Sequence, residues 1–108
     1  MVSFKDWQNL DLRVGLIKNV EDLEGKDKLY KLTVSFGEEE KTVVSGIKLD
    51  YPNKEELENK KVAFIYNLDP ATIAGVESQA MIMGALNEEG KYKLVFMDDT
   101  LKEGTKLE

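Results

Sequence analysis

Apolar and polar residues alternate along much of the chain, with the two-residue period of β-strands that bury one face. The first such stretch covers residues 11–23, where Leu12, Val14 and Val20 are apolar positions among polar ones. The side-chain phase shifts near Gly15, and we interpret this shift as a β-bulge. The pattern therefore predicts one long, curved strand near the start of the chain.

Later segments repeat the strand pattern. Residues 29–36 are rich in β-formers, and a turn at residues 37–40 leads back into an apolar run at residues 41–44, which predicts a hairpin. A nearly continuous apolar run at residues 61–67 is typical of a strand buried on both faces. The remaining predicted elements are strands at residues 79–86 and 92–97 and a further hairpin in the weakly alternating tail at residues 98–107.

Helical spacing is found in two short segments. Phe4, Trp7 and Leu10 follow an N-cap type serine and share one helical face, so we expect a short helix that buries Trp7 against one end of the folded chain. Residues 54–60 form a charged run after an asparagine, which predicts a second short helix with solvated sides.

Several short strands, glycine-containing turns and one intervening helix favour an all-β fold. A five-stranded Greek-key barrel with short helices and extra terminal strands fits this order of elements. At 108 residues, 42% of them hydrophobic, the chain is long enough for one core and too short for two, so residues 1–108 are predicted to be a single domain.

The composition excludes several kinds of chemistry. The chain has no cysteine and no histidine, so disulfides and thiolate chemistry are absent, as is the commonest metal ligand and general base. We therefore expect no metal, no cofactor and no enzymatic activity. No apolar run approaches the ~20 residues that span a bilayer, and none near the start has signal-peptide length, so the prediction is a cytoplasmic protein without membrane contact.

Three sequence blocks carry a family resemblance. They are DLRVG at residues 11–15, VVSG at residues 43–46 and NLDPATIAGVESQAMIMGA at residues 67–85. In their order and spacing they resemble the tRNA-binding domain family, and the resemblance covers nearly the whole chain. That family comprises OB-fold modules appended to methionyl- and phenylalanyl-tRNA synthetases, together with small stand-alone homodimers that include an export-chaperone-like branch.

The resemblance implies an OB-fold, pairing into a homodimer through the terminal strands, and tRNA as a partner. It also implies that the third block takes part in RNA contact, which by position indicates Asn67, Ser78, Gln79 and Met81. Hydroxyl and amide groups of this kind can hold sugar and phosphate or read base edges. The residues alone leave another possibility open, in which Asn67 caps the turn at residues 69–70, Ser78 satisfies loop backbone and Met81 belongs to the core.

A barrel of this type binds oligonucleotides on its second and third strands, which adds Ser45 and a strip of lysines to the candidates. Lys28 and Lys48 are the members of that strip expected to contact RNA. The alternative is that the strip consists of scattered surface lysines with acidic neighbours. The strip comprises Lys26, Lys28, Lys31, Lys41 and Lys48, and the acidic neighbours are Asp22, Glu24, Asp27 and Asp50.

Arg13 is the only arginine and could contact either a phosphate or an internal carboxylate, with Asp11 and Glu77 as candidates for the latter. We favour the internal role. Tyrosines could stack on bases, although tyrosines at barrel positions usually belong to the core. The tyrosines in question are Tyr30, Tyr51 and Tyr66.

The charge balance bears on the choice of function. Fifteen basic residues against 21 acidic ones give a net charge of −6, whereas nucleic-acid binders usually carry a basic footprint. Where relatives often place cations in the third block, this chain has Asp69, Thr72 and Ala74, which predicts weaker RNA binding. The leading hypothesis is a non-catalytic, structure-specific tRNA-binding homodimer. The alternative is a protein-interaction module, acting as a chaperone for unfolded polypeptides or as a subunit that docks on an aminoacyl-tRNA synthetase.

Overall fold

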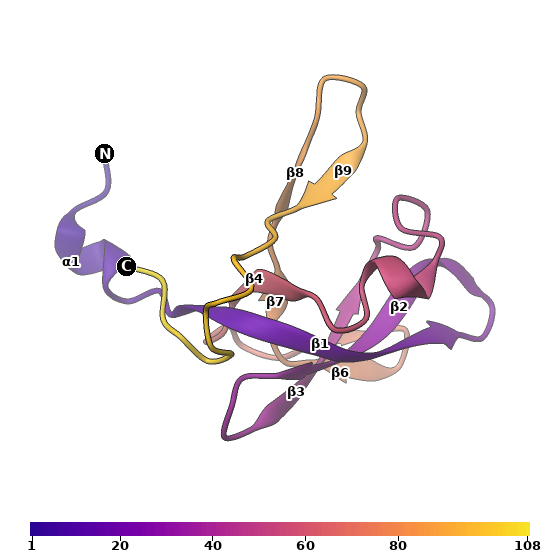
Figure 1. Ribbon diagram of the computed structural model, residues 1–108, viewed down its shortest axis with the longest axis horizontal. Helices are drawn as coiled ribbons and strands as arrows, with labels where there is room; N and C mark the ends of the chain where they lie inside the picture. Colours follow the sequence, from indigo (N-terminus) through magenta and orange to yellow (C-terminus); the bar gives the residue numbers. More distant parts are fainter.

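The computed structural model describes residues 1–108 and is built mainly of antiparallel strands (Figure 1). Five strands form one sheet in the order β3-β2-β1-β4-β7, and two separate hairpins pair β5 with β6 and β8 with β9. The predicted all-β fold is confirmed. The sheet strands are β1 (Leu12–Leu23), β2 (Lys26–Ser35), β3 (Glu40–Ser45), β4 (Lys61–Ile65) and β7 (Met81–Ile82), and the hairpin strands are β5 (Ala71–Ile73), β6 (Val76–Ser78), β8 (Gly84–Leu86) and β9 (Tyr92–Leu94).

β1 is the long, curved strand that the sequence predicts. Its first half pairs with β4 and its second half with β2, so it must bend between two neighbours. The register shift lies between Ile17 and Asn19 and not at Gly15, which corrects the predicted position of the bulge. Gly15 is required for another reason, because a Cβ there would lie 2.6 Å from side-chain atoms of Phe64 and Val34.

The core lies inside the curve of the sheet. Tyr30 and Phe64 are its largest fully buried side chains, and the rings of Phe36 and Phe64 meet edge to face with centroids 5.5 Å apart. The alternating positions of the predicted hairpin supply much of this core, as expected for strands with one buried face. Other members include Ile17, Val20, Leu32, Val34, Val43, Ile47, Leu57, Val62 and Ile82.

No β-ladder joins the outer strands β3 and β7, so the five paired strands form an open sheet. Residues 78 and 79 lie beside β3 instead. The Gln79 amide donates to the Thr42 carbonyl at 2.8 Å, and the Thr42 amide donates to the Gln79 side-chain oxygen at 2.8 Å. A side chain thus takes the place of one strand partner at this seam.

The single strand predicted over residues 79–86 is interrupted. Its two parts are β7 and β8, and Met83 between them changes partner: its amide donates to the Ala63 carbonyl while its own carbonyl accepts from Val95, both at 3.0 Å. The chain leaves β4 at this point and enters the β8–β9 hairpin, which extends away from the sheet (Figure 1).

The tail does not form the predicted hairpin. It runs beside the start of β1, where the Leu107 amide donates to the Leu12 carbonyl at 2.8 Å and the Val14 amide donates to the Thr105 carbonyl at 2.9 Å. The free edge of β1 offers backbone partners that a short hairpin in the tail would lack.

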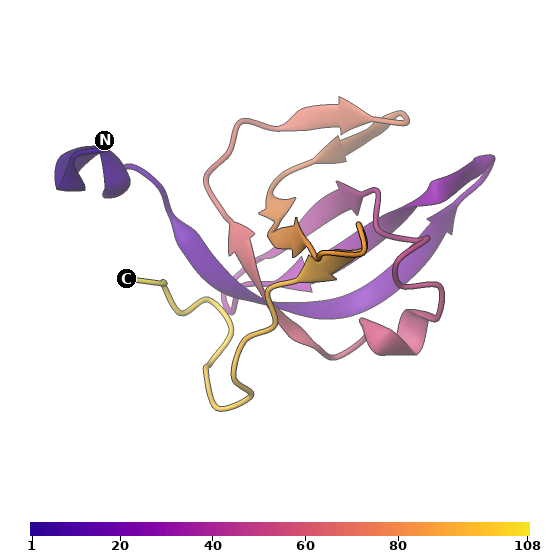
Figure 2. The same ribbon diagram turned by 90° about the horizontal axis from the view of Figure 1, so that it is seen from above.

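The helix α1 (Phe4–Trp7) is a single turn that lies beyond the start of β1, away from the sheet (Figures 1 and 2). Phe4 is 72% exposed and Trp7 is 38% exposed, so the expected packing of Trp7 on the barrel end is wrong for the single chain. The short connection to β1 places the helix past the edge of the core. The second helix is also shorter than expected, a 3₁₀ turn η1 (Lys54–Glu56), and neither is long and apolar enough to cross a membrane.

Candidate nucleic-acid interface

Three of the sequence-predicted residues meet at one end of β3. Tyr30 in β2 pairs with Asp22 in β1 on one side and with Ser45 in β3 on the other. Directly after β3, the Lys48 amide donates to the Lys28 carbonyl at 3.3 Å. The structure therefore brings Lys28, Ser45 and Lys48 together around a row that crosses three neighbouring strands.

An ion cluster covers this end of the core. The Nζ atom of Lys48 lies 2.8 Å from one carboxylate oxygen of Asp22, and the Nζ atom of Lys54 lies 3.0 Å from the other. Hydrogen bonds from the two lysines lower the pKa of Asp22, and the bond to Asp22 raises the pKa of Lys48. Sequence reasoning missed Lys54 because it lies on η1, far along the chain from its partner.

Ser78 and Gln79 hold the seam beside β3. Ser78 is buried, and its hydroxyl accepts from the Val44 amide at 3.0 Å and donates to the Ala80 carbonyl at 3.4 Å. Gln79 uses its side-chain oxygen for the Thr42 amide. Both side chains satisfy backbone groups, which is the structural possibility that the sequence left open for Ser78.

Met81 faces solvent. It lies in β7 opposite Ile65 and is 48% exposed, whereas its neighbour Ile82 is buried. Met81 is therefore not a core residue in the single chain, and its thioether is accessible to a ligand.

Asn67 lies at the opposite end of β3. The nearest β3 residue on that side is Lys41, whose Nζ atom donates to the Tyr66 carbonyl at 2.9 Å. Ser45 is four positions after Lys41, which corresponds to about 13 Å along a strand. Asn67 therefore does not join the cluster around Lys28 and Lys48.

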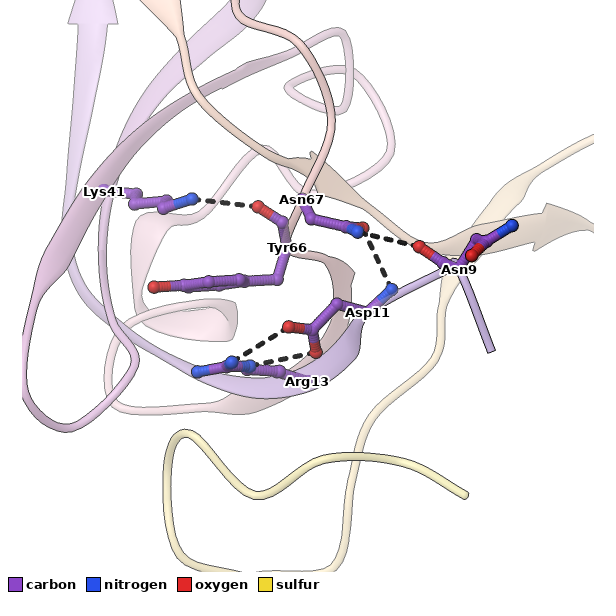
Figure 3. A network of polar contacts seen from close by, with 6 residues as sticks. All are labelled: Asn9, Asp11, Arg13, Lys41, Tyr66 and Asn67. Atoms are coloured by element: carbon purple, nitrogen blue, oxygen red, sulfur yellow. Dashed lines mark hydrogen bonds and ion pairs between the residues drawn. The ribbon is translucent and has the colours of Figure 1, made fainter. Parts of the chain in front are cut away.

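The Asn67 side chain connects two segments far apart in the sequence. Its Oδ1 atom accepts from the Asp11 amide at 2.9 Å, and its Nδ2 atom donates to the Asn9 carbonyl at 2.9 Å (Figure 3). The side chain therefore bonds to the segment before β1 and does not cap the turn at residues 69–70, which was one possibility that the sequence left open.

Arg13 takes the internal role that the sequence favoured. Its Nε and Nη2 atoms donate to the two carboxylate oxygens of Asp11 at 3.0 and 2.9 Å, and this hydrogen bonding lowers the pKa of Asp11. The Tyr66 ring lies between Arg13 and Lys41, at 4.0 Å from the guanidinium carbon and 3.7 Å from the ammonium nitrogen (Figure 3). With cations on the ring and Tyr30 and Tyr51 buried, none of the three candidate tyrosines offers an open face for base stacking.

A wide groove of about 940 Å³ opens beside this stack. Arg13 and Lys102 line it together with three carboxylates, Glu38, Glu39 and Glu103. The mixture of charges makes the groove a poor match for a run of phosphates, so the lysine end of β3 is the better candidate for RNA contact.

The third sequence block contains a regular hairpin of β5 and β6. Ala74 and Gly75 form its two-residue turn with φ values of 52° and 78°. Positive φ at both positions is the feature of a type I′ turn. Asp69 and Thr72 are exposed on this hairpin and its approach.

A curved antiparallel sheet with lysine, hydroxyl and amide groups along one outer strand is the arrangement of small β-domains that bind through a sheet face. Residues 12–106 match the sequence family described as "Putative tRNA binding domain", and the chain belongs to this family. The resemblance inferred from the three sequence blocks is thereby confirmed.

The similar proteins include methionine-tRNA ligases and CsaA chaperones. The chain is 40% identical over 106 residues to a methionine-tRNA ligase of Caldanaerobacter subterraneus subsp. tengcongensis, covering 98% of this chain and 16% of the ligase. It is similar in structure to a MetRS related protein from Pyrococcus horikoshii, with a TM-score of 0.93, 38% identity and coverage of 99% and 97% of the two chains. It is also similar to the CsaA chaperone protein from Picrophilus torridus, with a TM-score of 0.88, 34% identity and full coverage of both chains.

Proposed function

We propose that this chain is a non-catalytic module that binds tRNA and recognises the shape of the tRNA rather than its nucleotide sequence. The observation that carries the proposal is the family match over residues 12–106, supported by cationic and hydroxyl groups on the β2–β3 face. The chain spans about a sixth of the length of the ligases that it matches. The ligase activity named for those proteins is not assigned to this chain, and docking on a synthetase is a separate proposal.

We assign direct RNA contact to Lys28, Ser45 and Lys48 at one end of β3, with Gln79 and Met81 extending the surface towards β7. Asn67 and Ser78 belong to the same binding module, and their hydrogen bonds favour a role in positioning its segments over a contact with RNA. Non-specific contacts of this kind depend on phosphate neutralisation, so affinity falls as salt rises.

The proposal includes an OB-fold barrel that residues 1–108 form as one domain, working in the cytoplasm without metal or cofactor. The hydrogen bonds between β3 and residues 78–79 support closure of the barrel at this seam. The similarity to solved chains of nearly equal length supports the single domain.

We further propose that the module is a homodimer. Large apolar side chains are exposed on the terminal elements, with Phe4 on α1, Leu86 on β8 and Phe96 after β9 among them. Exposed apolar surface of this kind favours association. Sedimentation at micromolar protein is expected to give a dimer, and a concentration-independent monomer would contradict this part of the proposal.

Fluorescence anisotropy tests the RNA proposal. Labelled unfractionated tRNA is titrated with protein at low and moderate salt, and an unstructured RNA of the same length serves as the control. We expect tighter binding to tRNA than to the control, with a negative salt slope. A folded protein that binds neither RNA at low salt would overturn the proposal.

A second function has its own support. The net charge of −6 is unfavourable for RNA, and two similar structures are those of chaperone proteins. We propose as the alternative that the chain interacts with proteins, either unfolded polypeptides or a synthetase. Suppression of the aggregation of a chemically unfolded test protein, at salt concentrations where tRNA does not bind, would favour this alternative.

A further inference from the structure

In the ion cluster, two lysine ammonium groups contact the single carboxylate of Asp22. Lys48 and Lys54 each approach a different oxygen of Asp22, at 2.8 and 3.0 Å. The two lysines come from separate segments after β3, and the carboxylate comes from the end of β1. A phosphodiester also presents two anionic oxygens on one centre, so Asp22 occupies the position in which a phosphate would meet both ammonium groups.

The positions of the lysines are restrained by the fold. The Lys48 amide is bonded to the Lys28 carbonyl, and its Nζ atom lies 5.8 Å from the centroid of the Tyr30 ring. Tyr30 is fully buried and donates its hydroxyl to the Tyr51 carbonyl at 2.7 Å. The cluster therefore lies directly on the buried core.

The Asp22 carboxylate can be replaced by another anion as the partner of the two lysines. The Asp22 side chain is 50% exposed, and exposed ion pairs contribute little free energy in water. A phosphate can replace it without opening the core. The two ion pairs with Asp22 must break when a phosphate binds the lysines. The free energy of these ion pairs is therefore subtracted from the free energy of RNA binding.

We infer that Asp22 is an internal competitor for phosphate and sets the RNA affinity of the lysine pair Lys48 and Lys54. This inference rests on the proposed function and deepens it, because it names the residue that weakens RNA binding at that site. It also identifies Lys54 as a contact residue beside Lys48.

The test compares Asp22→Asn with Glu24→Gln. Both variants remove one negative charge from the β1–β2 hairpin, but the Glu24 side chain makes no ion pair. Binding of unfractionated tRNA is measured by anisotropy at fixed low salt, with circular dichroism as the check of folding and Asp22→Ser as the second variant. We expect Asp22→Asn to bind about tenfold more tightly than Glu24→Gln.

A double-mutant cycle tests whether the effect of Asp22→Asn on RNA affinity depends on Lys48 and Lys54. With both lysines changed to glutamine, Asp22→Asn is expected to differ little from Glu24→Gln, because the competition has been removed. Equal affinities of Asp22→Asn and Glu24→Gln in the otherwise unchanged chain, with wild-type binding intact, would overturn the inference and leave the proposed function standing. Binding by Asp22→Asn alone would support the inference and show that the wild-type site is masked, whereas no binding by any folded variant would overturn both.

Discussion

The side chain of Asn67 holds the backbone of Asp11 at the start of β1. Its Oδ1 atom accepts from the Asp11 amide at 2.9 Å, although 56 residues separate the two positions. The other half of the same amide group donates to the Asn9 carbonyl at 2.9 Å. One side chain thus fixes the path by which the N-terminal segment, including α1, leaves the sheet.

Asn67→Ala is expected to release this segment. Two hydrogen bonds are lost at an exposed site, so the free energy of unfolding should fall by about 1 kcal/mol. Urea unfolding gives the stability, and hydrogen exchange of the Asp11 amide reports the local opening. Asn19→Ala, which removes a single exposed side-chain bond to Glu21, is the control. Unchanged protection of the Asp11 amide would contradict the assignment.

The ion pair of Asp11 and Arg13 makes stability depend on pH. Because the pKa of Asp11 is lower in the folded chain than its ordinary value, the carboxylate contributes stability above the unfolded value of about 3.9. That contribution is lost as the pH falls through the lower folded pKa. Asp11→Asn should therefore be less stable than the wild type by roughly 1 kcal/mol at pH 7 and nearly equal at acid pH. If the difference in the free energy of unfolding between the wild type and Asp11→Asn were the same at every pH, this role would be disproved.

Alanine substitutions at Gly90 and Gly104 distinguish the cost of backbone strain from the cost of steric overlap. Gly104 and Gly90 both have positive φ, at 88° and 78°, but a Cβ on Gly104 would lie 2.2 Å from the Phe36 carbonyl oxygen, whereas a Cβ on Gly90 would meet nothing within 4 Å. Gly90→Ala should cost about 1 kcal/mol through strain alone. Gly104→Ala should cost about 1–3 kcal/mol more, through overlap, and loosen the tail from β1. Equal melting temperatures of the two variants would contradict the close approach.

The turn between β5 and β6 can be improved. Ala74 has a φ of 52°, a conformation that alanine adopts only with strain, and it precedes Gly75. Ala74→Asn would create the Asn-Gly pair that type I′ turns prefer and should raise the free energy of unfolding by about 0.5–1 kcal/mol. Ala71→Asn, in the exposed strand before the turn, should be neutral or destabilising. Thermal unfolding of the two variants measures the difference.

Adding cations on and beside the β5–β6 hairpin tests whether this hairpin takes part in RNA binding. Asp69→Lys combined with Thr72→Lys adds two exposed ammonium groups, and Thr72 is preferred to Ala74 because the latter lies in the strained turn. The double variant should bind tRNA more tightly, and each new phosphate contact should add about one unit to the salt slope. Glu88→Lys combined with Glu89→Gln, in the β8–β9 turn, changes the net charge by the same three units and is the control for general charge. Equal gains from both pairs would show that the hairpin is not part of the interface.

Local patterns in the sequence determined much of the fold. The alternation of residues 29–44 around the turn at residues 37–40 predicted the β2–β3 hairpin, because strand period and turn chemistry act between near neighbours. The pairing of Arg13 with Asp11 was also foreseeable, since the two residues are two positions apart at the start of β1, where extended backbone places alternate side chains on the same face. The family blocks likewise determined the family.

Only the tertiary structure decided which distant segments meet. Nothing near Asn67 indicated that it would bond to Asp11, and nothing near Asp22 indicated Lys54, because both contacts arise when a curved sheet brings separate loops together. Trp7 is a second example, in which the local structure was predicted correctly but the burial of the side chain was not. The helical spacing of its segment was read correctly, but burial depends on whether the core lies beneath that face, and in the folded chain the segment extends past the end of β1.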